Sequence, residues 1–290
     1  MIILNAFSKL HPITKGAFFI CAFVLVLSAS NPFFSVISLC CALLFVLAGG
    51  GRAFFSSLKL SVIVILLVSI FNMLFAHYGE DVLFRIGYTD FTLQALFYGF
   101  NQGMVMAAVM LWFSALSYTQ DSVDTMYLLR FMPKLAMLFS MVLGFLPRFT
   151  RKLSDIRDAQ KGLHGGESVS IKERFGEGIQ NLSALVTYSL ESSIVTADSM
   201  NARGYKDGVI LPTRFKLSAR DAFYLAFITL AFSYVLYVII TKQSLFIFEP
   251  RIYVKANSVT AEIIFAAVML LPVILEAWEV LLWKRSQSKI

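Results

Sequence analysis

Charged residues are scarce in this sequence, and their scarcity argues against a large water-soluble core. Only 15% of the 290 residues are charged, whereas soluble domains carry about 25%. Hydrophobic residues make up 58% of the chain, and they collect in long runs that contain no charge. Such runs are typical of helices that face lipid. The composition therefore predicts an integral membrane protein.

Residue types that bind metals are also few. Cys21, Cys40 and Cys41 lie inside apolar runs without the spacing of a zinc site, and we interpret them as small buried hydrophobic side chains. The three histidines are His11, His77 and His164. They are scattered among separate loops, so no two of them are expected to share a metal. We expect no metal site, no cofactor and no catalytic residue.

Two further absences concern energy supply and ion pathways. A phosphate-binding loop requires a lysine and a hydroxyl residue after its last glycine, and the glycine clusters at 49–51 and 165–166 lack that ending. Ionisable groups deep in the spans are expected of a self-sufficient carrier or channel, yet the first five apolar runs have none. The sixth run contains Glu262, Glu276 and Glu279, which we expect to reach headgroups or water near its ends. A secondary transporter or channel stays the alternative to the function inferred below, and a membrane-bound enzyme is a third class for which no catalytic constellation is present.

Six apolar runs predict an all-α protein with about six transmembrane helices. The runs are 16–30, 33–48, 60–76, 93–118, 222–240 and 261–282. A span needs about 20 residues, so the first two runs are slightly short. Asn31 and Pro32 between them predict a tight turn and a helical hairpin. The predicted parts are transmembrane helices 1–4 in 1–118, a cytoplasmic helical region in 119–221, and helices 5–6 in 222–290.

The positive charge predicts the orientation. The net charge of +7 could indicate nucleic-acid binding, but the basic residues lie in the loops between apolar runs, so we expect no nucleic-acid partner. With the N-terminus inside, 21 of the 25 lysines and arginines fall in the inner segments 1–15, 49–59, 119–221 and 283–290. Because inner loops are enriched in Lys and Arg, both termini are predicted to be cytoplasmic in a multi-pass protein of the cell membrane.

The region 119–221 has helical periodicity. An apolar stretch at 135–146, bounded by Pro133 and Pro147, predicts a short helix on or partly in the membrane. An amphipathic pattern follows Pro147 and stops at a glycine-rich break in 161–167. A last amphipathic helix is predicted at about 175–202.

The end of this last helix contains the most specific pattern in the chain. Ala202-Arg203-Gly204 closes the helix. A cation in a last turn followed by glycine is also how helices are commonly capped. Alternatively, an arginine there can enter a groove on a partner protein and form a bidentate ion pair with a carboxylate. Gly204, which has no side chain, would let the partner come close to the backbone.

Other stretches occur in a matching order over roughly residues 8–222. They are Leu10-His11-Pro12-Ile13-Thr14-Lys15, residues 72–80, Phe145-Leu146-Pro147-Arg148-Phe149 and Ile156-Arg157-Asp158-Ala159-Gln160-Lys161. Together with Ala202-Arg203-Gly204 they resemble the transmembrane T component (EcfT/CbiQ family) of energy-coupling factor (ECF) transporters, which are ABC importers. The segments 145–149 and 156–161 resemble the family's first coupling helix. Many members have a second Ala-Arg-Gly after its Ala-Gln, where this chain has Lys161-Gly162-Leu163 after Ala159-Gln160. Lysine lacks the planar guanidinium group of arginine.

The resemblance implies a function and partners. The chain would be the scaffold subunit that couples ATP hydrolysis by two cytoplasmic ABC ATPase subunits to reorientation of a membrane-embedded, substrate-binding S component, for vitamin or metal-ion uptake. The coupling residues that it implies are Ala202, Arg203, Gly204, Gln160, Lys161 and Gly162. The chain itself would not be an enzyme.

Overall fold

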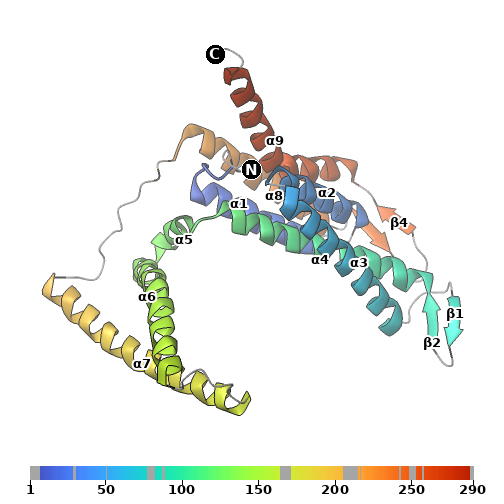
Figure 1. Ribbon diagram of the computed structural model, residues 1–290. Helices are drawn as coiled ribbons and strands as arrows, with labels where there is room; N and C mark the ends of the chain where they lie inside the picture. The colour runs from blue at the N-terminus through green and yellow to red at the C-terminus, as the bar shows by residue number, and fades with distance from the viewer. Residues whose placement is uncertain are drawn as a thin grey trace. The chain divides into compact units, whose positions relative to one another are not determined.

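The computed structural model divides the chain into two compact units (Figure 1). Unit 1 comprises Met1–Asp124 and Phe215–Ile290, and unit 2 comprises Thr125–Arg214. The residues described are 7–28, 31–49, 51–76, 82–86, 89–163, 171–204, 215, 217–241, 243–247, 253–256 and 258–287. Residues 77–80 and 164–167, which belong to patterns discussed above, lie outside them.

Each predicted apolar run of unit 1 is a helix. The helices are α1 (Pro12–Ser28), α2 (Pro32–Gly49), α3 (Gly51–Phe75), α4 (Leu93–Thr119), α8 (Ala219–Ile240) and α9 (Val259–Gln287). In the described part of the chain, four of them are long and apolar enough to cross a membrane. They are α4 and α8 over their whole length, α3 over residues 54–75, and α9 over residues 259–279. α1 and α2 are apolar but shorter. The membrane character is therefore confirmed, whereas the count of six spans is not.

Two short β-hairpins interrupt the helical chain. β1 (Val82–Ile86) pairs antiparallel with β2 (Thr89–Thr92) between α3 and α4, and β3 (Leu245–Ile247) pairs with β4 (Tyr253–Ala256) between α8 and α9. The sequence pattern predicted helices alone. Strands of three to five residues contain too little of the alternating pattern to be distinguished from loops.

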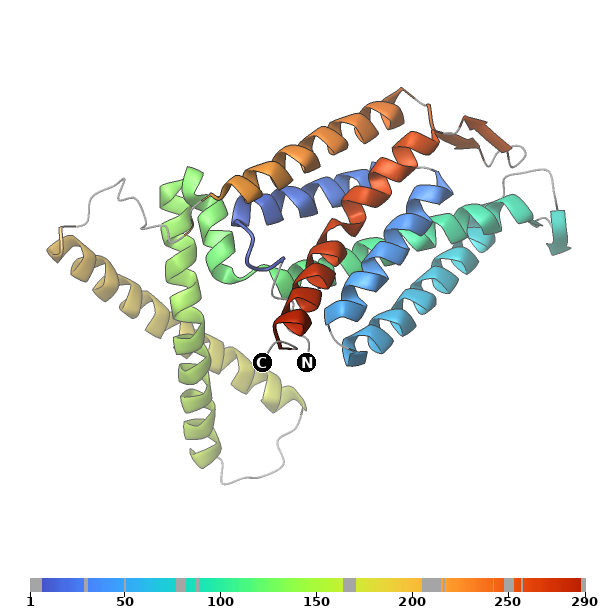
Figure 2. The same ribbon diagram turned by 90° about the horizontal axis from the view of Figure 1, so that it is seen from above.

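The turn between α1 and α2 is confirmed, but the predicted hairpin packing is wrong. The Oδ1 of Asn31 accepts a hydrogen bond from the backbone N–H of Phe33 at 3.1 Å, and its Nδ2 donates to Ser244 Oγ at 2.8 Å. Beyond this turn α1 packs chiefly against α8, and α2 against α4 and α9 (Figure 2). Turn residues determine where the chain reverses, whereas side-chain fit across helices determines which helices pack together.

An aromatic cluster forms the centre of unit 1. Trp112 of α4 is fully buried and lies edge-on to Phe18 of α1, with ring centroids 5.6 Å apart. Phe7 and Phe45 complete the cluster. The indole N–H of Trp112 donates a hydrogen bond to Ser38 Oγ at 3.1 Å. This bond replaces the one to water that the buried N–H group cannot make. One of the three cysteines departs from the prediction, because Cys40 is exposed on α2 while Cys21 and Cys41 are buried.

Glycines allow α3 and α4 to approach closely. A Cβ atom placed on Gly103 would lie 2.9 Å from Ile65 Cα, and one on Gly99 would lie 2.7 Å from Asn72 Cβ. Small residues permit such backbone approach between membrane helices.

Gly103→Ala is expected to destabilise unit 1 by about 1–3 kcal/mol, because the added methyl group meets backbone that cannot move aside. The measurement is the thermal unfolding midpoint of the chain in mild detergent. Gly144→Ala is the matched control, since nothing lies within 4 Å of a Cβ at Gly144 and alanine is the better helix former. A midpoint for Gly103→Ala at or above the wild-type value would contradict this packing argument.

Unit 2 consists mainly of two long helices. α5 (Ser122–Leu128) begins at the end of unit 1 and leads through the short 3-10 helix η1 (Leu129–Phe131) into α6 (Pro133–Leu163) and α7 (Ile171–Ala202). The predicted interruption at Pro147 is wrong, because α6 continues through it. An interior proline removes only its own N–H hydrogen bond and displaces the carbonyl one turn earlier, so a long helix can contain one.

Candidate functional site

α6 and α7 cross near their middles (Figure 2). At the crossing Phe149 meets Tyr188 edge-on, with ring centroids 6.4 Å apart, and the Lys152 ammonium lies 5.2 Å from the Tyr188 ring centroid. Next to the crossing, a cavity of about 390 Å³ separates the first half of α6 from the last half of α7 and is lined largely by apolar side chains such as Val142 and Met200. The two helices are thus joined at one place and diverge from it.

The end of α7 is built by Gly204. This residue has a φ of 72°, a left-handed conformation that glycine adopts without strain. Its N–H donates to the carbonyl of Asn201 at 3.0 Å, and the N–H of Arg203 donates to that of Ser199 at 3.1 Å. The predicted end of the helix is therefore confirmed. The Arg203 side chain is exposed, and its guanidinium makes no hydrogen bond or ion pair with the described residues.

Gly204→Ala is expected to loosen the last turn of α7 by about 1–2 kcal/mol, because a side chain at positive φ crowds the following carbonyl. Amide hydrogen exchange over 199–204 measures the effect. Gly162→Ala is the matched control, since Gly162 has open space and no positive φ, and the change should slow exchange in the last turn of α6. Equal exchange in the wild type and Gly204→Ala would show that the left-handed turn does not limit the helix end.

The other predicted group lies at the end of α6. Lys161 and Gly162 are exposed and Gln160 is half-buried. The Lys161 ammonium lies 3.7 Å from Asp158 Oδ1 on the same face, with both side chains largely in solvent. An exposed pair of this kind contributes little stability. Lys161 is therefore free to exchange this neighbour for a partner outside the chain.

The structure does not bring the two groups together. Gln160, Lys161 and Gly162 follow the crossing by about 12 residues, or roughly 18 Å of helix. Ala202–Gly204 follow it by about 15 residues, or roughly 22 Å, at the opposite end of α7 from the α6 connection. Unit 2 therefore presents two separate helix ends, each with an exposed cation.

The predicted apolar face of α7, namely Leu182, Leu185, Val186 and Leu190, is exposed except at Leu185, which is half-buried. Phe175, Ile179 and Ile194 are also exposed and extend it at helical spacing. A continuous apolar stripe of this length is typical of a surface that contacts a membrane or another protein.

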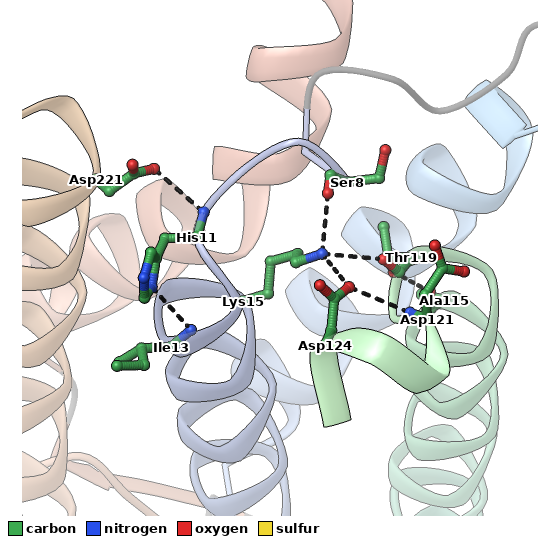
Figure 3. Close-up of polar contacts among 9 residues, drawn as sticks. All are labelled: Ser8, His11, Ile13, Lys15, Ala115, Thr119, Asp121, Asp124 and Asp221. Carbon is green, nitrogen blue, oxygen red and sulfur yellow. Dashed lines mark hydrogen bonds and ion pairs between the residues drawn. The ribbon is translucent and has the colours of Figure 1, made fainter. Parts of the chain in front are cut away.

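A polar cluster that the sequence analysis missed lies at the start of α1 (Figure 3). The Lys15 side chain is 1% exposed and forms an ion pair with Asp124 at 2.5 Å. Its ammonium also donates to the carbonyls of Ser8 at 2.9 Å and Thr119 at 3.5 Å. All three ammonium protons thus have an acceptor. From the sequence, Lys15 was only one of the inner basic residues and the end of the Leu10–Lys15 segment, because nothing in the sequence pairs it with a residue 109 positions away.

The same N-terminal segment reaches α8 and α9. The His11 N–H donates to Asp221 Oδ1 at 3.3 Å. The Phe7 N–H donates to Glu276 Oε1 at 3.0 Å, and Lys9 pairs with Glu279 at 3.0 Å. The prediction that the glutamates of α9 reach headgroups or water is wrong for Glu276, which is buried. A buried carboxylate needs such a donor because burial removes it from water.

These contacts show which helix ends share a side of unit 1. The starts of α1 and α8 and the end of α4 meet at Lys15, Asp221 and Thr119. At the other end, the α1–α2 turn meets the α8–α9 connection through Asn31 and Ser244. The predicted inner segment 1–15 therefore meets the unit 1 residues at the two ends of the predicted inner segment 119–221, and two predicted outer segments meet each other.

Comparison with known families gives one match. The model of a family described as CbiQ, cobalt transport protein, matches residues 5–213. The matched stretch covers the aromatic core, the polar cluster at Lys15 and both helix ends of unit 2. No curated protein matches the chain.

Proposed function

Because the chain belongs to the CbiQ family of cobalt transport proteins, we propose that it is the transmembrane scaffold subunit of an ATP-driven importer. In this proposal unit 2 faces the cytoplasm, and its two helix ends bind two ABC ATPase subunits. A separate membrane-embedded S component captures the substrate, a metal ion or a vitamin. The chain performs no catalysis itself.

The observation that carries the proposal is the pair of exposed helix ends in unit 2. Arg203 lies at one end without a partner among the described side chains. Lys161 lies at the other and forms only an exposed ion pair with Asp158. An arginine fork can bind a carboxylate on a partner through two parallel hydrogen bonds. Two separate ends suit two ATPase subunits, each with its own groove.

Coupling in this proposal is mechanical. When the ATPases close, they draw the ends of α6 and α7 with them, and long helices transmit such shifts as rigid bodies. Moving a two-state carrier from about 1:99 to 99:1 takes roughly 5.5 kcal/mol. The sequence contains no nucleotide-binding loop to supply this energy, so the partners supply it. The apolar stripe of α7 offers a surface on which the S component or lipid can lie.

The orientation follows from the distribution of charge. Unit 2 and the helix ends that gather with Lys15 contain most of the basic residues, which favours the cytoplasmic side. Both chain termini then lie in the cytoplasm of a multi-pass protein of the cell membrane.

The test is copurification of the tagged wild-type chain from its native membranes in mild detergent. We expect ATP-binding subunits and at least one further small membrane protein in the purified complex, together with measurable ATP hydrolysis. A second arm adds protease separately to the cytoplasmic face and to the outer face, and measures from which side unit 2 is cut. A complex without any ATP-hydrolysing subunit, or unit 2 cut only from outside, would overturn the proposal.

A further inference from the structure

The chain leaves unit 1 after Asp124 and returns to it at Phe215. These two junctions are 91 positions apart in sequence, yet residues of one N-terminal segment bind the unit 1 side of both (Figure 3). We call Ser8, His11, Thr14 and Lys15 the N-terminal clasp. All of its contacts described below lie within unit 1.

The first junction is bound by the Lys15 side chain. Its ammonium forms an ion pair with Asp124 and hydrogen bonds to the carbonyls of Ser8 and Thr119. Asp124 Oδ2 also accepts from the N–H of Asp121 at 3.2 Å. Thr119 ends α4 and Asp124 is the last residue of the first segment of unit 1, so the clasp holds both the end of α4 and the residue at the junction.

The second junction is bound by His11 and Thr14. The His11 N–H and the Thr14 hydroxyl donate to the side chain and the backbone carbonyl of Asp221, at 3.3 and 3.5 Å. The His11 ring lies edge-on to that of Phe215, with centroids 6.3 Å apart. The clasp therefore holds the first residue after the junction and the first turn of α8.

The polar bonds of the clasp fix the positions of the residues that they join more than they stabilise the fold. A buried ion pair must lose its hydration, and well-packed apolar residues in its place often give equal or greater stability. Directed hydrogen bonds, by contrast, hold their partners at set angles as well as distances. A segment that binds both junctions by such bonds restricts how each can turn.

We propose that the N-terminal clasp, by bonding Asp124 and Asp221 at the two chain junctions, transmits ATP-driven movement of unit 2 into the membrane helices of unit 1. Lys15 and Asp221 are positioning residues in this role, which rests on the proposed function. Without the clasp, unit 2 still binds the ATPases and moves with them, but the junctions bend and the membrane helices of unit 1 do not follow.

The test compares amide hydrogen exchange of the copurified complex without nucleotide and with ATP plus vanadate. The variant is Lys15→Met with Asp124→Leu, which removes both charges so that neither is left buried and unpaired. The matched control is Lys9→Met with Glu279→Leu, because this ion pair starts from the same segment but is partly exposed and contacts neither junction.

In the wild type and the control, nucleotide is expected to change exchange in α6 and α7 and also in α1, α4 and α8. In the variant, the change in α6 and α7 persists, while that in unit 1 falls about fivefold or more, a typical size for lost coupling between sites. Full persistence of the unit 1 response in the variant would overturn the proposal. A wild-type complex with no ATPase or no nucleotide response would instead overturn the proposed function.

The second junction gives an independent test in case the first variant does not fold. Asp221→Ala removes the acceptor for His11 and also the half of the α8 capping box that accepts from the Ser218 N–H at 3.1 Å. Ser218→Ala, which alters the capping box alone, is its control. We expect the unit 1 response to fall with Asp221→Ala and to persist with Ser218→Ala. The same response in both variants would assign Asp221 to helix capping only and overturn its role in the clasp.

Discussion

Arg203→Glu is expected to remove the ATPase subunit bound at the end of α7 from the purified complex while the chain still inserts into the membrane. The side chain is exposed at the end of α7 and bonds to none of the described residues, so the fold does not depend on it. Losing one partner of a charge pair at an interface costs about 2–5 kcal/mol, which corresponds to a roughly 30-fold or greater loss of affinity. A glutamate adds repulsion to that loss.

The measurement is the ratio of ATPase to chain after copurification, together with ATP hydrolysis by the complex. Arg203→Lys is expected to give an intermediate ratio, because lysine keeps the charge but not the planar fork. Arg151→Glu is the matched control, since Arg151 is exposed in the middle of α6 and the charge change is identical. Recovery of the ATPase with Arg203→Glu at the level of Arg151→Glu would remove Arg203 from the contact.

Lys15→Met is expected to cause the largest loss of stability of any single change discussed. The substitution leaves the buried carboxylate of Asp124 without its cation, and breaking a buried pair in this way costs roughly 3–5 kcal/mol. At about 2–4 °C per kcal/mol for a chain of this size, the unfolding midpoint should fall by roughly 10 °C. The measurement is thermal unfolding in mild detergent.

The double variant Lys15→Met with Asp124→Leu is expected to recover most of this loss, because neither charge is left unpaired. Lys9→Met, at a pair whose lysine is 65% exposed, should cost less than about 1 kcal/mol. Equal losses for Lys15→Met and Lys9→Met would show that the buried pair is not the source of the effect. The double variant thus separates stability from the geometric role proposed for the clasp.

The local sequence pattern was sufficient to predict the long helices of unit 1 and the two helix ends of unit 2. Uncharged runs predicted the long helices of unit 1, because lipid-facing helices must be apolar over their length. Gly204 predicted the end of α7, because only a residue that tolerates a positive φ forms that turn. The continuation of α6 through Pro147 was missed, since sequence shows the lost hydrogen bond but not the packing that compensates for it.

By itself, then, the sequence determined the membrane character, the long helices of unit 1 and the two cationic helix ends, all of which depend on residues near one another in the chain. Only the tertiary structure decided that Lys15 meets Asp124 and that His11 meets Asp221, pairs separated by 109 and 210 positions. It also placed Glu276 against Phe7 rather than in water. The physical reason is that these polar groups are satisfied by partners whose nearness comes from helix packing, and helix packing leaves no local pattern in the sequence.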